Sequence, residues 1–437
     1  MNLTSTNGRA PATGFRRAVR EGLAPDGGLY LPEEYPRLDT RDLAAWRGLP
    51  FAEVARQLAG RLLEGEFDRG VLDRIVGDAM NFPVPVRQID EGLWLLELFH
   101  GPTLAFKDFG ARLLARLFGE VLRDEGDHAT VLVATSGDTG SAVARGFAGV
   151  PRTRVVVLYP AGKVSPFQEA QMATIGGNVT AVRVPGVFDD CQRLVKAALL
   201  DPDLAPLGLS SANSINIGRL LPQMFYYVTS QLAVAPSRPV VFVVPSGNLG
   251  NLTAGVMAAQ MGLPVSRFVA ATNANDVLPE YLDTGTFRPR PSMPTLSNAM
   301  DVGDPSNFAR LAALYGSSAA RMREAITGIR VAEHDTRAEI RETYRRTGIV
   351  LDPHAAVACS AARRVRAGGG AGEPVIALAT AHPAKFADVI REELGFEPEL
   401  PASERDWRSR PLLAVDLAEA TPRAFTRLLA GLSPAAS

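Results

Sequence analysis

The chain has 437 residues, of which 46% are apolar and 21% charged, and its formal net charge at pH 7 is −1. The length predicts more than one domain, and the composition is that of an ordinary globular protein. The near-zero charge gives no reason to expect nucleic acid as a partner, and no apolar run approaches the ~20 residues of a membrane span.

The first 94 residues lack the alternating pattern seen later, and we expect them to form a mostly helical N-terminal appendage. The start of the chain has no apolar signal-peptide core, and Cys191 and Cys359 read as buried small side chains in a reducing compartment. The five histidines are scattered, so we expect no protein-bound metal. These features together predict a cytoplasmic protein.

The stretch "HGPTLAFKDFG" contains Lys107, the first lysine of a chain in which lysine is rare. Lysine occurs only at positions 107, 163, 196 and 385, and arginine makes up the rest of the 46 basic residues. A lysine amine can lose its proton when partly buried and then act as a base or form an imine, which arginine cannot do. Lys107 is therefore a candidate for covalent chemistry, although a codon bias toward arginine also explains the ratio. Lys196 fits an exposed position on an amphipathic helix.

From residue 129 onward, short apolar runs alternate with helical patterns. The first run of the alternation has strands at 129–137, 154–160 and 178–185 and helices at 138–149, 165–176 and 188–200. After a long helix at 218–233, the second run has strands at 239–247, 266–273 and 374–380 and helices at 252–262 and 385–395. Continuous apolar strands between helices indicate parallel sheets covered on both faces. We expect a smaller α/β domain at 95–221, a larger one at 222–400, and a peripheral C-terminal tail at 401–437.

Ligands of open α/β sheets bind at the carboxyl ends of the strands, so the residues after each strand are the candidates for a site. The strand at 239–244 is followed by "PSGNLGNLTAG", a glycine turn at the start of a helix that could cradle a phosphate. The alternative is a plain strand–turn–helix connection, because the motif is neither a Walker A loop nor a GxGxxG fingerprint.

Three other strand ends carry polar motifs. "TSGDTGSA" could form a second anion cradle, or Asp138 or Thr139 could simply cap the helix. In "NSINIGR", Arg219 could clamp an oxyanion or lie at the surface. In "TAHPAKF", Thr380 and Lys385 could be a cap and a solvated charge. An amine nucleophile, two anion cradles and an arginine clamp together suit a carbonyl cofactor with a phosphate arm, pyridoxal phosphate (PLP), and an anionic amino-acid substrate.

Seven separated motifs resemble those of one family, the threonine synthases, which are PLP enzymes of fold type II. They are "HGPTLAFKDFG", "ATSGDTGSA", "SANSINIGR", "PSGNLGNLTAG", "NAMDVGDPSNF", "LDPHAAVA" and "TAHPAKF", in the family's order, and "GLAPDGGLYLPE" resembles its N-terminal signature. The resemblance runs from near residue 20 to about residue 395. It implies an α/β fold with two doubly wound, mostly parallel domains, here with the N-terminal appendage added.

The resemblance also implies roles for individual residues. Lys107 would form the imine with the cofactor and later move protons. The cofactor would further contact Asp138 at its 3-hydroxyl, Thr380 at its pyridine nitrogen, and Gly247, Asn248, Leu249, Gly250 and Asn251 at its phosphate. The substrate would bind Ser136, Gly137, Thr139, Asn213, Ser214, Asn216, Arg219 and, with less support, Lys163.

The implied enzyme is a carbon–oxygen lyase that converts O-phospho-L-homoserine and water to L-threonine and phosphate. We expect a small-molecule substrate, no nucleic acid, no membrane, and a monomer or homodimer. The alternatives are a serine or threonine dehydratase, a specialised-metabolism enzyme of γ-elimination, a non-catalytic ligand-binding relative, and an unrelated nucleotide-binding α/β protein. Asn7, Leu249 and Ala355 depart from residues common in the family and leave room for an altered substrate.

Overall fold

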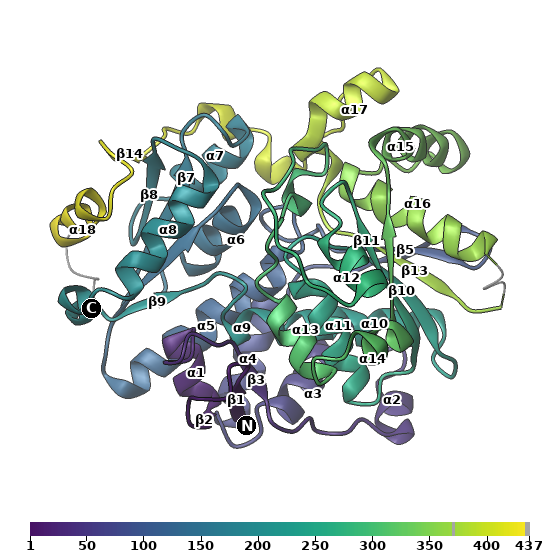
Figure 1. Ribbon diagram of the computed structural model, residues 1–437, viewed down its shortest axis with the longest axis horizontal. Helices are drawn as coiled ribbons and strands as arrows, with labels where there is room; N and C mark the ends of the chain where they lie inside the picture. The colour runs from purple at the N-terminus through teal and green to yellow at the C-terminus, as the bar shows by residue number, and fades with distance from the viewer. Residues whose placement is uncertain (369–371, 433–437) are drawn as a thin grey trace.

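The alternating apolar strands of the sequence assemble into two separate sheets, with the smaller one on the left of Figure 1 and the larger one on the right. A computed structural model of the protein describes residues 1–368 and 372–432. Within these two ranges no helix combines the length and apolarity needed to cross a bilayer.

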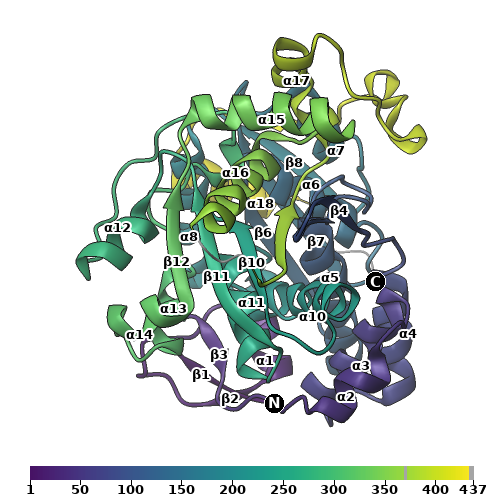
Figure 2. The same cartoon turned by 90° about the vertical axis from the view of Figure 1, so that its right-hand side faces the viewer.

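The larger sheet has six strands, and all neighbours are parallel except the edge pair β4 and β5. In spatial order the strands are β12 (Ile326–Arg330), β11 (Val265–Thr272), β10 (Val240–Pro245), β13 (Val375–Ala379), β5 (Leu93–Glu97) and β4 (Val86–Asp90). Successive side chains of β10 enter different cores. Phe242 packs on the side of α10 (Gln223–Val234) and α11 (Gly250–Gln260), and Val243 packs on the side of α16 (Pro353–Ala367). Figure 2 shows α16 lying across this sheet.

The smaller sheet has five parallel strands. Their spatial order is β14 (Val415–Asp416), β8 (Val179–Val184), β7 (Thr153–Pro160), β6 (Ala129–Ala134) and β9 (Leu209–Ser211). Val131 of β6 faces the core shared with α5 (Lys107–Glu125) and α6 (Asp138–Phe147). Leu132 faces the core shared with α8 (Phe188–Leu199) and α18 (Pro422–Gly431). Burial on both faces explains why these strands read as unbroken apolar runs.

The helices near the two sheets connect successive strands or pack on the sheet faces. Those near the smaller sheet are α5 (Lys107–Glu125), α6 (Asp138–Phe147), α7 (Pro166–Ala173), α8 (Phe188–Leu199), η1 (Pro202–Leu207), α9 (Ile217–Leu220) and α18 (Pro422–Gly431). Those near the larger sheet are α10 (Gln223–Val234), α11 (Gly250–Gln260), α12 (Val277–Thr284), α13 (Phe308–Leu314), α14 (Ala319–Ala325), α15 (Glu333–Thr347), α16 (Pro353–Ala367), η3 (Pro383–Phe386) and α17 (Ala387–Leu394). The helix expected at 218–233 is divided into α9 and α10 at Pro222, which cannot donate a backbone hydrogen bond.

The N-terminal segment is less helical than the sequence predicted. It contains α1 (Phe15–Glu21), α2 (Thr40–Trp46), α3 (Phe51–Leu62) and α4 (Arg69–Ala79), but also β1 (Asn2–Ser5), β2 (Thr13–Gly14) and β3 (Tyr30–Pro32). The three strands form an antiparallel sheet in the order β2-β1-β3. Strands of two to four residues are too short to show a recognisable alternation of apolar and polar side chains, so the sequence pattern missed them.

Three elements, β5, β14 and α18, belong to different parts of the structure than the sequence division suggested. The expected boundary before residue 95 falls inside β5, which pairs with β13 in the larger sheet. The tail after residue 400 supplies β14, which pairs with β8, and α18, which packs on α8. The tail therefore completes one edge of the smaller sheet.

Candidate active site

Lys107 is the first residue of α5 and lies beside the carboxyl end of β13. The backbone N–H of Phe106 donates a 2.9 Å hydrogen bond to the carbonyl of Thr380, and Ala105 forms a bridge with Ala381. The structure therefore brings together Lys107 and Thr380, two of the predicted site residues. Lys107 is half-buried. Burial lowers the pKa of its amine to about 8, against the opposing effect of the Asp138 carboxylate.

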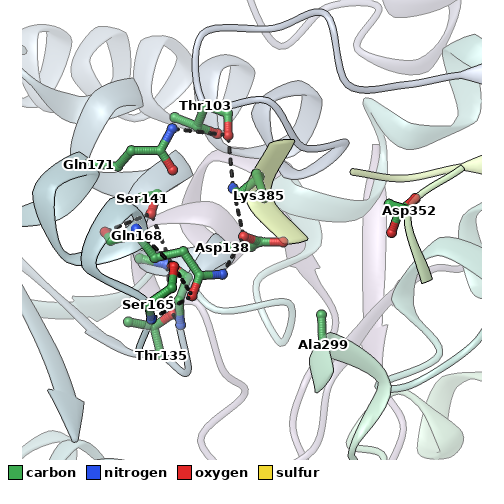
Figure 3. A network of polar contacts seen from close by, with 12 residues as sticks. Thr103, Thr135, Asp138, Ser141, Ser165, Gln168, Gln171, Ala299, Asp352 and Lys385 are labelled. Carbon is green, nitrogen blue, oxygen red and sulfur yellow. Dashed lines mark hydrogen bonds and ion pairs between the residues drawn. The ribbon is translucent and has the colours of Figure 1, made fainter. Parts of the chain in front are cut away.

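A buried ion pair joins Lys385 to Asp138, from segments that follow strands of different sheets (Figure 3), and both charges act on Lys107. The ammonium of Lys385, from η3 after β13, lies 2.6 Å from the Asp138 carboxylate at the start of α6, and the two side chains are 0% and 4% exposed. Lys385 also donates to the carbonyl of Thr103 at 2.9 Å, and Gln168 donates to Asp138 at 2.9 Å. Burial alone would raise the pKa of Asp138, but the charges of Lys385 and Lys107 hold it well below its usual range. The alternative that Lys385 is a solvated charge is therefore wrong.

The turn before α6 is held by Thr135. Its hydroxyl accepts hydrogen bonds from the N–H groups of Gly137 at 2.9 Å and Gly140 at 2.8 Å. Gly137 has φ +139°, and a side chain there would also strike Gln168. Gly137 itself is the N-cap of α6, so neither Asp138 nor Thr139 caps the helix.

The turn leaves two of the predicted substrate contacts accessible. Ser136 is exposed and Thr139 is half-buried, so a ligand can reach both hydroxyls. Gly137, the third, has its N–H bonded to Thr135 and is held in the turn.

The loop 247–251 lies between β10 and α11 and has the geometry of an anion cradle. Leu249 adopts a left-handed conformation with φ +62°. The first N–H that bonds along α11 is that of Thr253, which donates to the carbonyl of Leu249 at 2.9 Å. The N–H groups before it have no partner within the helix and can bind an anion. Gly247 packs so closely that a side chain would lie 2.7 Å from the Met300 Cα.

Asn251 contributes an unsatisfied donor to the same loop. Its side-chain oxygen, Oδ1, accepts hydrogen bonds from the hydroxyls of Tyr226 at 2.6 Å and Tyr227 at 2.8 Å. Its Nδ2 amide is buried and has no partner among the described residues. A buried donor without an acceptor is costly, and a phosphate oxygen would satisfy it. The loop therefore fits the phosphate arm of PLP.

Arg219 is buried, with 3% of its surface exposed, so the surface alternative is wrong. One terminal nitrogen donates to the carbonyl of Ala212 at 2.5 Å, and the Nε has no partner in the described ranges. Burial lowers the pKa of Arg219 to about 10, and the nearby Asp108 carboxylate opposes this shift. A buried guanidinium with donor capacity left over suits an anionic ligand.

The other residues of the "NSINIGR" motif divide into two groups. Asn213 exchanges hydrogen bonds with the backbone of Ala134, and Asn216 is fully buried and bonds the backbone of Val19, Ser211 and Gly218. Both asparagine side chains therefore hold the backbone of the fold in place. Ser214 instead lies against the loop 247–251. A Cβ atom placed on Gly250 would lie 3.6 Å from the Cβ atom of Ser214.

Two residues near the start of α13 were missed by the sequence pattern: Asn307, which precedes the helix, and Arg310, which lies in its first turn. The amide of Asn307 donates to the Ser214 hydroxyl at 3.2 Å and to the Asn248 carbonyl at 3.1 Å. Arg310 is 0% exposed and donates to the carbonyls of Tyr30, Ser214 and Ile215 and to the Asn307 side chain. For Asn307 the sequence signal was the lack of regular pattern in "NAMDVGDPSNF", which is typical of ordered loops near sites, whereas Arg310 lies beyond this stretch.

Lys163 stands apart from these contacts. It is exposed in the turn after β7, and within residues 1–368 and 372–432 no hydrogen bond or ion pair joins its ammonium to the cluster. Geometry thus gives its predicted substrate contact no support.

The site has more positive than negative charges. Lys107, Arg219 and Lys385 are basic, and Asp108 and Asp138 are acidic. Burial raises the pKa of Asp108 to about 6, although Thr103 donates to both of its oxygens. A site with excess positive charge favours anionic ligands, in agreement with a phosphorylated cofactor and an anionic substrate.

Comparisons with known proteins cover almost the whole chain. Residues 81–381 match the family described as "Pyridoxal-phosphate dependent enzyme", residues 2–80 match "Threonine synthase N terminus", and residues 355–427 match "Threonine synthase, C-terminal". The chain is 42% identical to the threonine synthase of Haemophilus influenzae, over 95% of this chain and 97% of the relative. It is 40% identical to that of Escherichia coli, over 95% and 96%.

Solved structures agree with this relationship. PLP-bound threonine synthase from Brucella melitensis has a TM-score of 0.92 and 39% identity, with 98% of each chain covered. The yeast enzyme has a TM-score of 0.91 and 31% identity, with 98% of each chain covered. The predicted α/β fold, cofactor and family are thereby confirmed. The chain belongs to the threonine synthase family of pyridoxal-phosphate-dependent enzymes.

Proposed function

We propose that the protein converts O-phospho-L-homoserine and water into L-threonine and inorganic phosphate. The observation that carries the proposal is the half-buried Lys107 in a positively charged site at the carboxyl ends of the strands. A dehydratase would need the lysine and one phosphate cradle. The additional buried arginine, Arg219, favours a substrate with a phosphate of its own.

The cofactor would be held by the loop 247–251 through its free N–H groups and the Asn251 amide, with Lys107 binding its aldehyde. Thr380, buried at the end of β13, would face the ring nitrogen, where a hydroxyl leaves that nitrogen unprotonated. Bound PLP supplies an electron sink for the pair of electrons released at the substrate's α-carbon.

The protein's own task is to move protons and hold anions. Lys107 Nζ would take the α-proton and then a β-proton, and return protons as the product forms. This role requires a neutral amine, which its lowered pKa of about 8 provides in a larger fraction than for an exposed lysine. Ser136 and Thr139 would bind the substrate carboxylate through their accessible hydroxyls.

Arg219 and Ser214 would bind the substrate phosphate. Arg219 would stabilise the negative charge that grows as the C–O bond to phosphate breaks. Asn213 and Asn216 would position this loop, and Lys163 is not included in the proposed site. Activity in the cytoplasm as a monomer or homodimer, without nucleic acid, stays a prediction from composition.

The test is to incubate the purified, cofactor-loaded protein with O-phospho-L-homoserine and measure threonine and phosphate. The proposal predicts equal amounts of both and little 2-oxo acid from serine or threonine. A fast release of 2-oxo acid from serine or threonine, with no threonine from O-phospho-L-homoserine, would favour the dehydratase.

A further inference from the structure

The ion pair between Lys385 and Asp138 has no task in the function proposed so far. Its two members follow strands of different sheets, 247 positions apart in sequence, and meet at 2.6 Å with almost no exposure to solvent. Desolvating two charges is expensive, and a buried ion pair is often no more stabilising than apolar residues of similar volume. Such a pair next to a reactive amine calls for a chemical explanation.

Two cations act on the Asp138 carboxylate. Lys385 is in direct contact, and Lys107 is close enough to help hold the pKa of Asp138 down. Two of the chain's four lysines thus share one carboxylate. Lys385 also donates to the carbonyl of Thr103, in the loop that leads into α5, so it is fixed relative to the Lys107 backbone.

We propose that Lys385 is a positioning residue for Lys107: by neutralising Asp138 it prevents that carboxylate from holding Lys107 as a permanent cation. The inference rests on the role of Lys107 proposed above. A carboxylate without Lys385 would stabilise the ammonium form of Lys107 and make it a poor base. With Lys385 in place, Asp138 can contact the ligand while its charge is already balanced.

Other charged groups around Lys107 also act on its pKa. Arg219 from α9 lowers its pKa, as Lys385 from η3 does, and Asp138 from α6 raises it. Asp108, next to Lys107 on α5, is buried with a pKa of about 6, and His382 lies near Lys385. Of these groups, only Lys385 is in ionic contact with Asp138 in the described ranges, so its removal would leave the Asp138 carboxylate without its contact cation.

The experiment measures how fast the cofactor-free protein captures added PLP, followed by absorbance as a function of pH. Only a neutral amine attacks the aldehyde, so the midpoint of the rate profile reports the pKa of Lys107. The parent should have a midpoint near its lowered pKa of about 8. Lys385→Met should raise the midpoint by about one unit or more, so that capture at pH 7 is roughly tenfold slower.

Two variants separate this effect from a loss of packing. Asp138→Asn should lower the midpoint, because Lys385 and Arg219 then repel the Lys107 proton without a counter-charge. The double variant Lys385→Met with Asp138→Asn removes both charges and should return the midpoint toward that of the parent. Lys196→Met, an exposed lysine on α8, is the matched control and should leave the profile unchanged.

The outcomes are distinguishable. If Lys385→Met and Asp138→Asn both leave the midpoint unchanged, Lys385 does not act on Lys107 and the inference is wrong. If Lys385→Met raises only the KM for O-phospho-L-homoserine, Lys385 binds substrate directly and the inference is also wrong. If Lys385→Met does not fold, the midpoints of Asp138→Asn and of the double variant still show whether the two charges act on Lys107. Capture that persists in Lys107→Arg would instead contradict the proposed function itself.

Discussion

The side-chain amide of Asn248 donates a 2.7 Å hydrogen bond to the hydroxyl of Ser214. Asn248 belongs to the loop after β10 in the larger sheet, and Ser214 follows β9 in the smaller sheet. The loop proposed for the cofactor phosphate and the loop proposed for the substrate phosphate are therefore in direct contact. Two phosphates bound so close together repel, and each needs donors of its own.

This contact makes Arg219→Ala an informative variant. We expect kcat/KM for O-phospho-L-homoserine to fall about ten- to a hundredfold, because a hydrogen bond to a charged group is worth roughly 1.5–3 kcal/mol. The absorbance of bound cofactor should stay the same, since its phosphate uses the loop 247–251. Steady-state kinetics and the absorbance spectrum measure the two effects.

Inorganic phosphate provides a second readout for the same variant. It should compete with substrate in the parent and inhibit Arg219→Ala weakly. Arg193→Ala, which removes an arginine 51% exposed on α8, serves as the control and should behave like the parent. Loss of cofactor from Arg219→Ala would show that the two phosphate sites have been assigned the wrong way round.

Lys107→Arg keeps a positive charge but removes the primary amine. We expect borohydride reduction of the cofactor-loaded parent to fix the cofactor on Lys107, as peptide mass spectrometry can show, and no fixed cofactor in the variant. Turnover should fall by at least roughly a thousandfold, the range of a lost general acid–base group. A variant with parental turnover would mean that another group moves the protons.

Asp108→Asn tests whether the buried charge of Asp108 destabilises the fold. Burial raises the pKa of Asp108 from its ordinary 3.8 to about 6, so the fold favours the protonated acid and loses stability as pH rises between these values. Asparagine can keep both contacts to Thr103 without a charge. Relative to the parent, the variant should gain up to about 3 kcal/mol in unfolding free energy between pH 4 and pH 7. Urea denaturation at the two pH values checks this, and a pH-independent difference would refute it.

Arg310→Met tests how the N-terminal segment supports the site. The Arg310 guanidinium ties the backbone of β3, at Tyr30, to the loop at Ser214 and Ile215. Its removal leaves buried carbonyls without donors, and we expect a loss of about 3 kcal/mol in unfolding free energy. Arg423→Met, at an exposed position of α18, should change it by less than about 0.5 kcal/mol. Equal stability of the two variants would show that water replaces the guanidinium.

Much of the fold could be predicted because its information is local. The strands of both sheets are buried on two faces and read as continuous apolar runs. The helix expected from residue 165 begins there as α7, where Ser165 caps it through a 3.2 Å bond from the Gln168 N–H and Pro166 follows. The three N-terminal strands were missed because they are too short to show a regular alternation of apolar and polar side chains.

The site was predictable only in part, since pairings between distant residues leave no local pattern. The motif of Lys107 and the glycine loop 247–251 could be recognised, but nothing in "TAHPAKF" shows that Lys385 meets Asp138. The family resemblance implied that Asn216 binds substrate, whereas its side chain is buried and hydrogen-bonded to backbone groups. Arg310 carries no sequence signal, because three of its four acceptors are backbone carbonyls from distant parts of the chain.

The most direct test of the central claim is to run the reaction of O-phospho-L-homoserine in water enriched in oxygen-18 and to analyse both products by mass spectrometry. Elimination breaks the bond between the γ-carbon and oxygen, and water then adds at the β-carbon. The account predicts one heavy oxygen in the hydroxyl of threonine and none in the released phosphate. Heavy oxygen in the phosphate, with homoserine as the other product, would mean simple hydrolysis of the phosphate ester and would contradict the assignment.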